Sequence, residues 1–151
     1  MLVVERPADM KAHVGQSLGT SDWVLVDQAT IDKFADATGD HQWIHVDVAR
    51  AKREMPNGKT IAHGFLTLSL LAGLAHQIYE IRQRSRGINY GSNKVRFTAP
   101  VPVGSRVRLH QTLKSVDDTE GGVRLTFDSR MEVEGSPRPA LVAETLSLAY
   151  D

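Results

Sequence analysis

The chain has 151 residues, of which 41% are hydrophobic and 24% are charged, the proportions of a soluble globular protein. Its 18 basic and 18 acidic residues balance, so a basic surface for nucleic acid is not expected. There are no cysteines, which excludes disulfides, thiolate metal sites and a cysteine nucleophile. The N-terminal residues lack the apolar run of a signal peptide, and we expect a cytoplasmic protein of one domain, residues 1–151.

The N-terminal third predicts a strand followed by two short helices. Residues 20–26 have the β-branched and aromatic bias of a strand. Asp27 is a suitable N-cap, and apolar residues at helical spacing continue to Gly39, a suitable C-terminal stop. A second helix is expected over residues 47–53, ahead of a turn at residues 55–58.

A long apolar segment follows, since residues 60–79 contain no Lys, Arg, Asp or Glu. The helix that it predicts is apolar on every face, as in a helix buried in a core or spanning a membrane. Polar side chains such as His63 favour the buried helix, because they would lack partners in lipid. Arginines from Arg82 to Arg86 complement its C-terminus, and Gly87 can cap it.

After Gly87 apolar and polar residues alternate, which is typical of strands that cover a core with one face. Glycines at the intervening turns favour hairpins. The strands are expected at residues 93–97, 105–113, 123–133 and 141–148. These elements predict an α+β fold in which a curved antiparallel sheet wraps around one long buried helix.

Two further patterns suggest chemistry that their context does not support. Residues 15–19 fit Gly-x-Ser-x-Gly, but a nucleophile elbow needs a preceding strand and a larger α/β sheet, so a turn is expected there. A zinc site could combine Asp40, His41, His45 and His63. Their spacing matches no metal-binding signature, and we predict neither a metal nor another cofactor.

Asp40 and His45 are the candidate catalytic pair. Asp40 follows Gly39 in a predicted loop, and His45 lies just before the next helix. A carboxylate and an imidazole at this spacing can converge on one water molecule, where one group accepts its proton while the other orients it or protonates the substrate. From spacing alone, a turn-forming Asp and a structural His are the more common roles for such residues.

Gly64 stands near the start of the predicted central helix, where free backbone N–H groups and the helix dipole favour negative charge. Glycine lets a carbonyl group come close to these donors, so a thioester could be polarised there. The alternative is a glycine that only allows tight packing of the helix on the sheet.

Three motifs together have the pattern of a known family. They are Gly39-Asp40-x-x-x-Ile44-His45, Ala62-His63-Gly64-Phe65 and the strand and turn from Val95 to Gly104. The combination, spread over about residues 15–150, resembles the MaoC-like (R)-specific enoyl-CoA hydratases, also called hydratase 2. This resemblance implies a single hot-dog fold and the reversible hydration of trans-2-enoyl-CoA, or of the acyl-carrier-protein thioester, to the (3R)-3-hydroxyacyl thioester.

The resemblance also implies site residues and partners. Asp40 and His45 become the catalytic dyad, and the backbone N–H of Gly64 becomes a donor to the thioester carbonyl. Family members usually form homodimers whose sheets join edge to edge, and no nucleic acid or membrane is implied as a partner.

One departure concerns the residues between the dyad. The family commonly has Asn-Pro where this chain has Gln42-Trp43. Gln42 could supply the orienting amide one methylene further out, whereas Trp43 lacks the fixed φ of proline. A hot-dog thioesterase and a non-catalytic acyl-thioester-binding subunit are the alternative functions.

Overall fold

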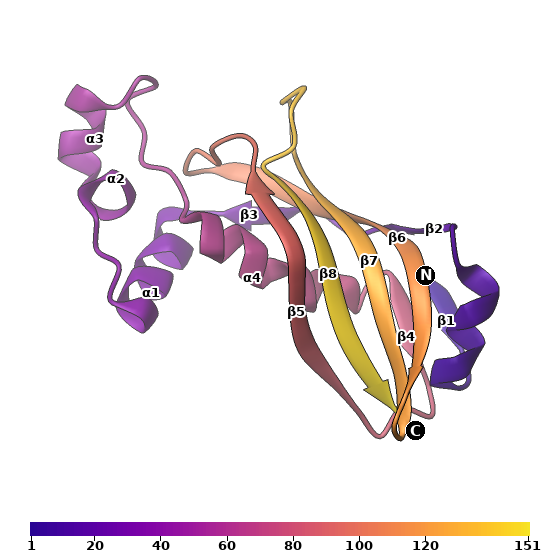
Figure 1. The fold of residues 1–151 in the computed structure, drawn as a ribbon. Coiled ribbons are helices and arrows are strands. Elements are labelled where there is room, and N and C mark those ends of the chain that lie inside the picture. The colour runs from indigo at the N-terminus through magenta and orange to yellow at the C-terminus, as the bar shows by residue number, and fades with distance from the viewer.

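A computed structural model describes the whole chain, residues 1–151. The strands form a curved sheet along one side of a helix, and three short helices extend beyond one end of the sheet as an arm (Figure 1). The strands are β1 Leu2–Val4, β2 Ser17–Thr20, β3 Val24–Val26, β4 Tyr79–Ile81, β5 Arg86–Phe97, β6 Ser105–Thr119, β7 Gly122–Val133 and β8 Leu141–Tyr150. The helices are a 3-10 helix Pro7–His13, α1 Gln28–Thr38, α2 Trp43–Val46, α3 Val48–Glu54 and α4 Gly64–Ala75.

The main sheet is antiparallel throughout, in the order β2-β6-β7-β8-β5, and β3 also pairs with β6. The β6–β7 hairpin turns at Gly121, whose φ of 77° suits glycine. Alternate residues of β7, from Val123 to Val133, are buried in the core. The predicted α+β arrangement, with a central helix against a curved sheet, is confirmed (Figure 1).

The ends of α1 follow the predicted capping. The Asp27 carboxylate accepts a hydrogen bond from the Thr30 amide, and Gly39 ends the helix in the left-handed region with φ of 80°. The predicted helix at residues 47–53 is α3, which Asp47 caps by accepting from the Arg50 amide.

The predicted strand at residues 20–26 is instead two strands, β2 and β3, interrupted at Ser21. The Ser21 hydroxyl accepts the Leu109 amide at 2.9 Å, and it takes the place of a backbone carbonyl in the β6 ladder. A second difference lies in the predicted loop after Gly39, where residues 43–46 form one helical turn, α2.

The central helix is shorter than the apolar segment predicts. The segment before it, Thr60–Ala62, is extended and holds residues 101–103 through backbone hydrogen bonds of 2.8 and 2.9 Å. The segment after it turns into β4, which pairs in parallel with β1. The prediction for the helix C-terminus was therefore wrong, because Arg82 follows β4 and pairs with Glu5, while Gly87 belongs to β5.

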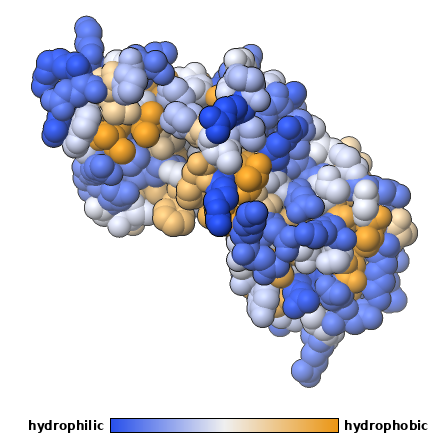
Figure 2. All heavy atoms as spheres, turned by 45° about the horizontal axis from the view of Figure 1, so that its top comes forward, coloured by the Kyte–Doolittle hydropathy of each residue, from blue (hydrophilic) through white to orange (hydrophobic).

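The prediction that α4 is buried on every face was also wrong. Leu66, Leu71 and Leu74 pack against the sheet, but Phe65 is 66% exposed because no layer covers the opposite side of the helix. Strand β5, at the sheet edge, is exposed along most of its length. Figure 2 shows apolar surface at the waist between the arm and the sheet. None of the helices is long and apolar enough to span a bilayer.

The outer face of the β6–β7 hairpin carries a charged cluster that should make stability depend on pH. Hydrogen bonds from Arg108 and His110 hold the pKa of the Glu132 carboxyl below its ordinary value. Because the pKa is lower in the folded state, the ionised carboxylate stabilises the fold at pH values above the unfolded-state pKa of about 4.3. This stabilisation is lost as the pH falls through the folded-state pKa. We expect Glu132→Gln to have a lower melting temperature than the wild type at pH 7. The difference between the two melting temperatures should narrow below pH 4.

Thermal unfolding followed by circular dichroism from pH 3 to pH 8 measures this difference. Glu120→Gln is the matched control, since Glu120 is exposed at the hairpin turn and makes no ion pair. An equal loss for Glu132→Gln at every pH would contradict the electrostatic role of the cluster.

Candidate active site

The extended segment Thr60–Ala62 joins the helical arm to the sheet. On one side the Ile61 amide donates to the Ile44 carbonyl of α2 at 3.0 Å. On the other side Ile61 forms a β-bridge with Pro102, which precedes β6. These contacts fix the position of the arm relative to the start of α4. Side chains of α2 therefore contact residues that immediately precede α4.

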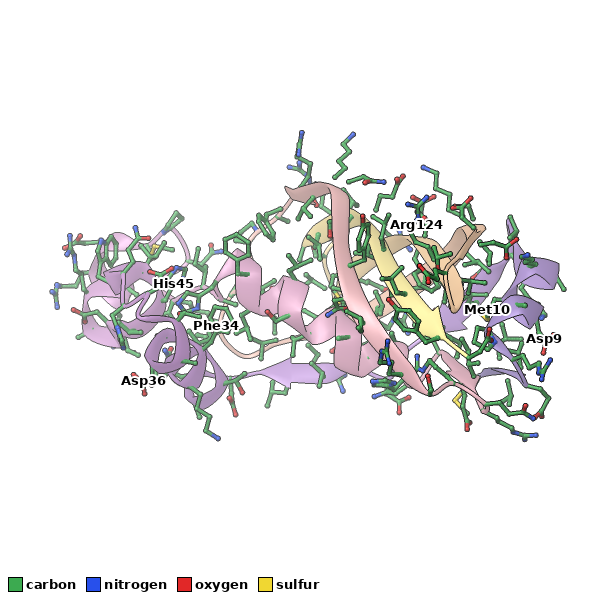
Figure 3. The ribbon with its side chains drawn as sticks, turned by 60° about the horizontal axis from the view of Figure 1, so that its bottom comes forward. Asp9, Met10, Phe34, Asp36, His45 and Arg124 are labelled. Atoms are coloured by element: carbon green, nitrogen blue, oxygen red, sulfur yellow. The ribbon has the colours of Figure 1, made fainter.

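His45 lies on α2 at this junction, and only 7% of its surface is exposed. Figure 3 shows its side chain near Phe34 of α1, where the arm meets α4. The Nδ1 atom of His45 lies 2.7 Å from the Ile61 carbonyl oxygen, which can only accept. Nδ1 therefore carries the proton of the neutral ring, and Nε2 is left as a free base.

His63 immediately precedes α4 and lies against His45. The two rings stack with centroids 3.8 Å apart, and Phe34 packs on His63 at 4.9 Å. The Nε2 atom of His63 donates to the Asp40 backbone carbonyl at 2.9 Å. Its Nδ1 atom is buried without a hydrogen-bond partner, which is uncommon for a buried polar atom and marks the ring as a functional candidate.

Asp40 completes the cluster from the loop after α1. One carboxylate oxygen of Asp40 and one ring nitrogen each of His45 and His63 lie within 4.8 Å of one another. The carboxylate also accepts a weak hydrogen bond from the backbone N–H of Gln42 at 3.4 Å. Asp40 is exposed and both histidines are buried, so the cluster reaches solvent through the Asp40 carboxylate.

A second layer of polar groups holds α2 in place. The Gln28 side chain donates to the His45 carbonyl at 2.8 Å and accepts from the Thr60 hydroxyl at 2.6 Å. Thr60 is only 1% exposed, so this bridge between α1, α2 and the extended segment is largely shielded from water. Sequence reasoning did not identify Gln28 or Thr60, because neither belongs to a motif and only the fold brings them together.

Gly64 is the first residue of α4, beside this cluster. The Leu66 and Thr67 amides donate to the His63 carbonyl, whereas the Gly64 amide has no backbone acceptor. A Cβ atom at Gly64 would lie 3.0 Å from the Phe97 ring of β5, so packing alone also favours glycine. Both interpretations of Gly64 therefore find support: a free helix N-terminal donor, and a close contact that a larger residue would disturb.

The other predicted candidates do not join the cluster. The Gln42 side chain is exposed and makes no hydrogen bond within the chain. Among the four possible metal ligands, His41 is separate: it bonds to Asp36 at 2.9 Å, and this hydrogen bond raises the pKa of the His41 ring. Of residues 15–19, Gly15 and Gln16 lie in the expected turn, whereas Ser17 already belongs to β2. The sequence identified His63 as a motif residue and a possible metal ligand, and its place directly before Gly64 is the signal that could have linked it to the dyad.

Comparisons with known proteins give the same fold and a common family. The family model for MaoC-like domains matches residues 9–132. The 3-hydroxyacyl-thioester dehydratase Z of Mycobacterium tuberculosis is 54% identical over 147 residues, covering 97% of each chain.

Two solved structures confirm the hot-dog fold. A monoamine oxidase regulatory protein from Archaeoglobus superposes with a TM-score of 0.80 and 22% identity, covering 100% of this chain and 99% of that chain. The (R)-hydratase from A. caviae involved in PHA biosynthesis has a TM-score of 0.71 and 25% identity, over 89% of this chain and 94% of that chain. The family match over most of the chain, together with the relative at 54% identity, shows that this chain belongs to the MaoC-like dehydratase family.

Proposed function

We propose that this protein catalyses the reversible hydration of trans-2-enoyl thioesters to (3R)-3-hydroxyacyl thioesters, acting in the cytoplasm as a single catalytic domain, residues 1–151. The convergence of the Asp40 carboxylate with the His45 imidazole is the observation that carries the proposal. The similarity to a 3-hydroxyacyl-thioester dehydratase supports the substrate class, which is a thioester of coenzyme A or of acyl-carrier protein.

In the hydration direction, a water molecule would lie between the dyad residues. The free Nε2 atom of His45 accepts one proton from the water, while the Asp40 carboxylate accepts a hydrogen bond from the other O–H. The water oxygen forms a bond to C3 of the enoyl group, and the proton taken from water is delivered to C2. The reverse sequence removes water from the 3-hydroxyacyl thioester.

Negative charge builds on the thioester oxygen as water adds at C3. The Gly64 N–H, at the positive end of α4, is a suitable donor to this oxygen because no backbone acceptor occupies it. There is no acidic side chain in the first turn of α4 to oppose that charge. Gln42, which is exposed beside Asp40, could orient the substrate from the solvent side.

We also propose a homodimer in which two copies join along β5. This strand has a free edge twelve residues long, and exposed edges promote pairing with another chain. Its exposed apolar side chains include Ile88, Tyr90 and Phe97, at 45%, 60% and 47% exposure. A second copy would cover them together with the open side of α4.

Replacing either dyad residue should abolish most of the activity. We expect Asp40→Asn and His45→Gln each to lower kcat for crotonyl-CoA hydration by at least ~10²-fold, since each removes a proton-transfer or water-binding group. Loss of the enone absorbance measures the rate, and chiral analysis of the product tests the (3R) configuration.

His41→Gln is the matched control, because His41 bonds to Asp36 outside the cluster. Near-normal rates in both dyad variants would contradict the mechanism. Release of free thiol from acyl-CoA would favour a thioesterase, and binding without turnover would favour a non-catalytic subunit. A rate abolished by EDTA and restored by a divalent cation would instead assign Asp40, His45 and His63 to a metal centre.

His63 should act on the rate by positioning both members of the dyad. His63→Phe keeps a flat ring against His45 but loses the hydrogen bond to the Asp40 carbonyl. We expect kcat to fall about tenfold, the equivalent of one lost hydrogen bond, with little change in KM. His63→Gln retains a side-chain N–H and should recover part of the rate. Equal rates for wild type and His63→Phe would exclude this role.

Light scattering after gel filtration tests the dimer. We expect twice the chain mass for the wild type and the mass of one chain for Tyr90→Glu, because the substitution places like charges on the two paired edges. Tyr90→Phe is the control and should remain dimeric. A wild-type protein of single-chain mass at micromolar concentration would contradict pairing along β5.

A further inference from the structure

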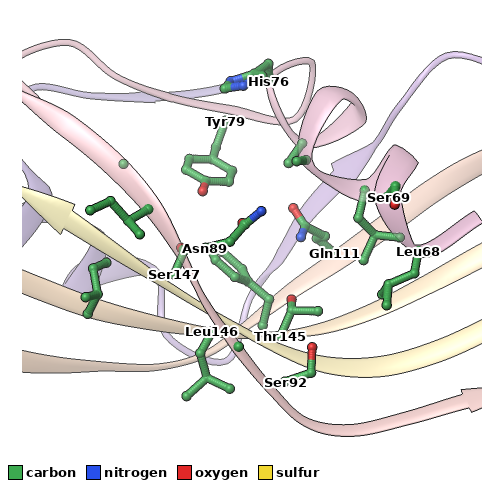
Figure 4. A pocket seen from close by; sticks show the side chains of 18 of the residues that line it. Leu68, Ser69, His76, Tyr79, Asn89, Ser92, Gln111, Thr145, Leu146 and Ser147 are labelled. Carbon is green, nitrogen blue, oxygen red and sulfur yellow. The ribbon is translucent and has the colours of Figure 1, made fainter. Parts of the chain in front are cut away.

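A second polar feature lies away from the dyad, in a cavity of about 430 Å³ between α4 and the strands β5 and β8 (Figure 4). Only nine of its 19 lining residues are hydrophobic, whereas ligand pockets are usually lined mostly by apolar side chains. The polar lining stands out because this concave face of the sheet otherwise supplies the hydrophobic core.

The cavity begins one helical turn beyond Gly64. Leu68, Leu71 and Ala75 of its lining follow Gly64 at helical spacing, so they share one face of α4. At a rise of 1.5 Å per residue, these side chains lie about 6 to 16 Å along the helix axis from the Gly64 amide. An acyl chain whose carbonyl is bound at Gly64 would run along this face into the cavity.

A row of polar side chains crosses the sheet beneath the cavity. The Gln111 side chain of β6 donates to the Ser129 hydroxyl of β7 at 3.2 Å, and Ser129 lies 3.2 Å from the Thr145 hydroxyl of β8. Ser92 of β5 is directly opposite Thr145 in the strand register. The row therefore spans four adjacent strands, and three of its four members line the cavity.

Gln111 leaves one hydrogen-bonding atom unused. Its side chain is only 5% exposed, and its Oε1 atom is buried without a partner. Figure 4 shows the Gln111 amide, the Tyr79 hydroxyl and the Asn89 amide directed into the same space. Burial raises the pKa of the Tyr79 phenol, so this group remains a neutral donor. Together they offer an acceptor and donors to one ligand group.

From these contacts we propose that the cavity selects acyl chains that carry a hydroxyl group on the tail. A hydroxyl donates to Gln111 Oε1, which a plain alkyl chain would leave without a partner, and it can accept from Tyr79 or Asn89. This inference rests on the proposed function, because it assumes that the thioester carbonyl is bound at Gly64.

The test compares trans-2-octenoyl-, trans-2-decenoyl- and trans-2-dodecenoyl-CoA with their ω-hydroxy derivatives. The wild type should show a higher kcat/KM for the hydroxylated member of at least one pair, by up to about tenfold, as expected for one buried hydrogen bond. Gln111→Leu should remove this preference. Thr145→Val, which deletes a neighbouring hydroxyl without changing volume, should weaken it.

For each variant, the ratio of kcat/KM between the hydroxylated and plain substrate is measured, so a general loss of activity cancels. Its melting temperature verifies that the variant folds. Gln83→Leu is the control, since Gln83 lies on the surface near Glu5 and should keep the wild-type preference. Hydration of crotonyl-CoA without any preference for hydroxylated tails would overturn the inference while leaving the proposed function intact. A larger gain for ω-carboxy chains would also overturn it and assign the selectivity to Arg84, the one charged residue of the lining.

If no thioester is hydrated, the proposed function fails and calorimetry still decides the inference. Saturated decanoyl-CoA and its ω-hydroxy derivative are then compared as ligands. Tighter binding of the hydroxylated chain that Gln111→Leu removes would support the cavity's selectivity, and equal affinities would overturn it.

Discussion

The site depends on one short hydrogen bond between the His45 ring and the Ile61 carbonyl. It fixes the tautomer of the imidazole and ties the helical arm to the segment that leads into α4. The Ile61 amide, bonded to α2, makes the same connection a second time. The Gln28 bridge and the hydrogen bond from His63 to the Asp40 carbonyl reinforce this pair of contacts. The protonation pattern of His45 and the position of the arm therefore depend on the same junction.

Much of the fold follows from local patterns. Caps at Asp27, Gly39 and Asp47 identified two helices because a cap is a contact between residues close in sequence. The limits of α4 were missed for the opposite reason. Its apolar composition cannot distinguish a helix from extended segments that are buried, and residues 60–62 are extended because distant residues 101–103 supply their hydrogen bonds. Tertiary pairing, absent from the local pattern, decided these boundaries.

The candidate site divides in the same way. Asp40 and His45 could be selected because two reactive side chains lie close together on either side of a predicted loop. Gln28, Thr60 and the stacked ring of His63 could not, since their roles arise only when α1, α2 and the extended segment meet. Likewise, the polar row from Gln111 to Thr145 could not be predicted from the alternation within any one strand, because its hydrogen bonds join different strands.

The contact between Phe97 and Gly64 has a consequence for how this enzyme could be regulated. Phe97 ends the free edge strand, and its ring rests on the first residue of the central helix. The ring and the backbone of Gly64 are in van der Waals contact, so a displacement of this edge would be expected to reach the start of α4. In the proposed dimer, a second copy paired along β5 would therefore press, through this one aromatic ring, on the helix start that is proposed to bind the thioester carbonyl.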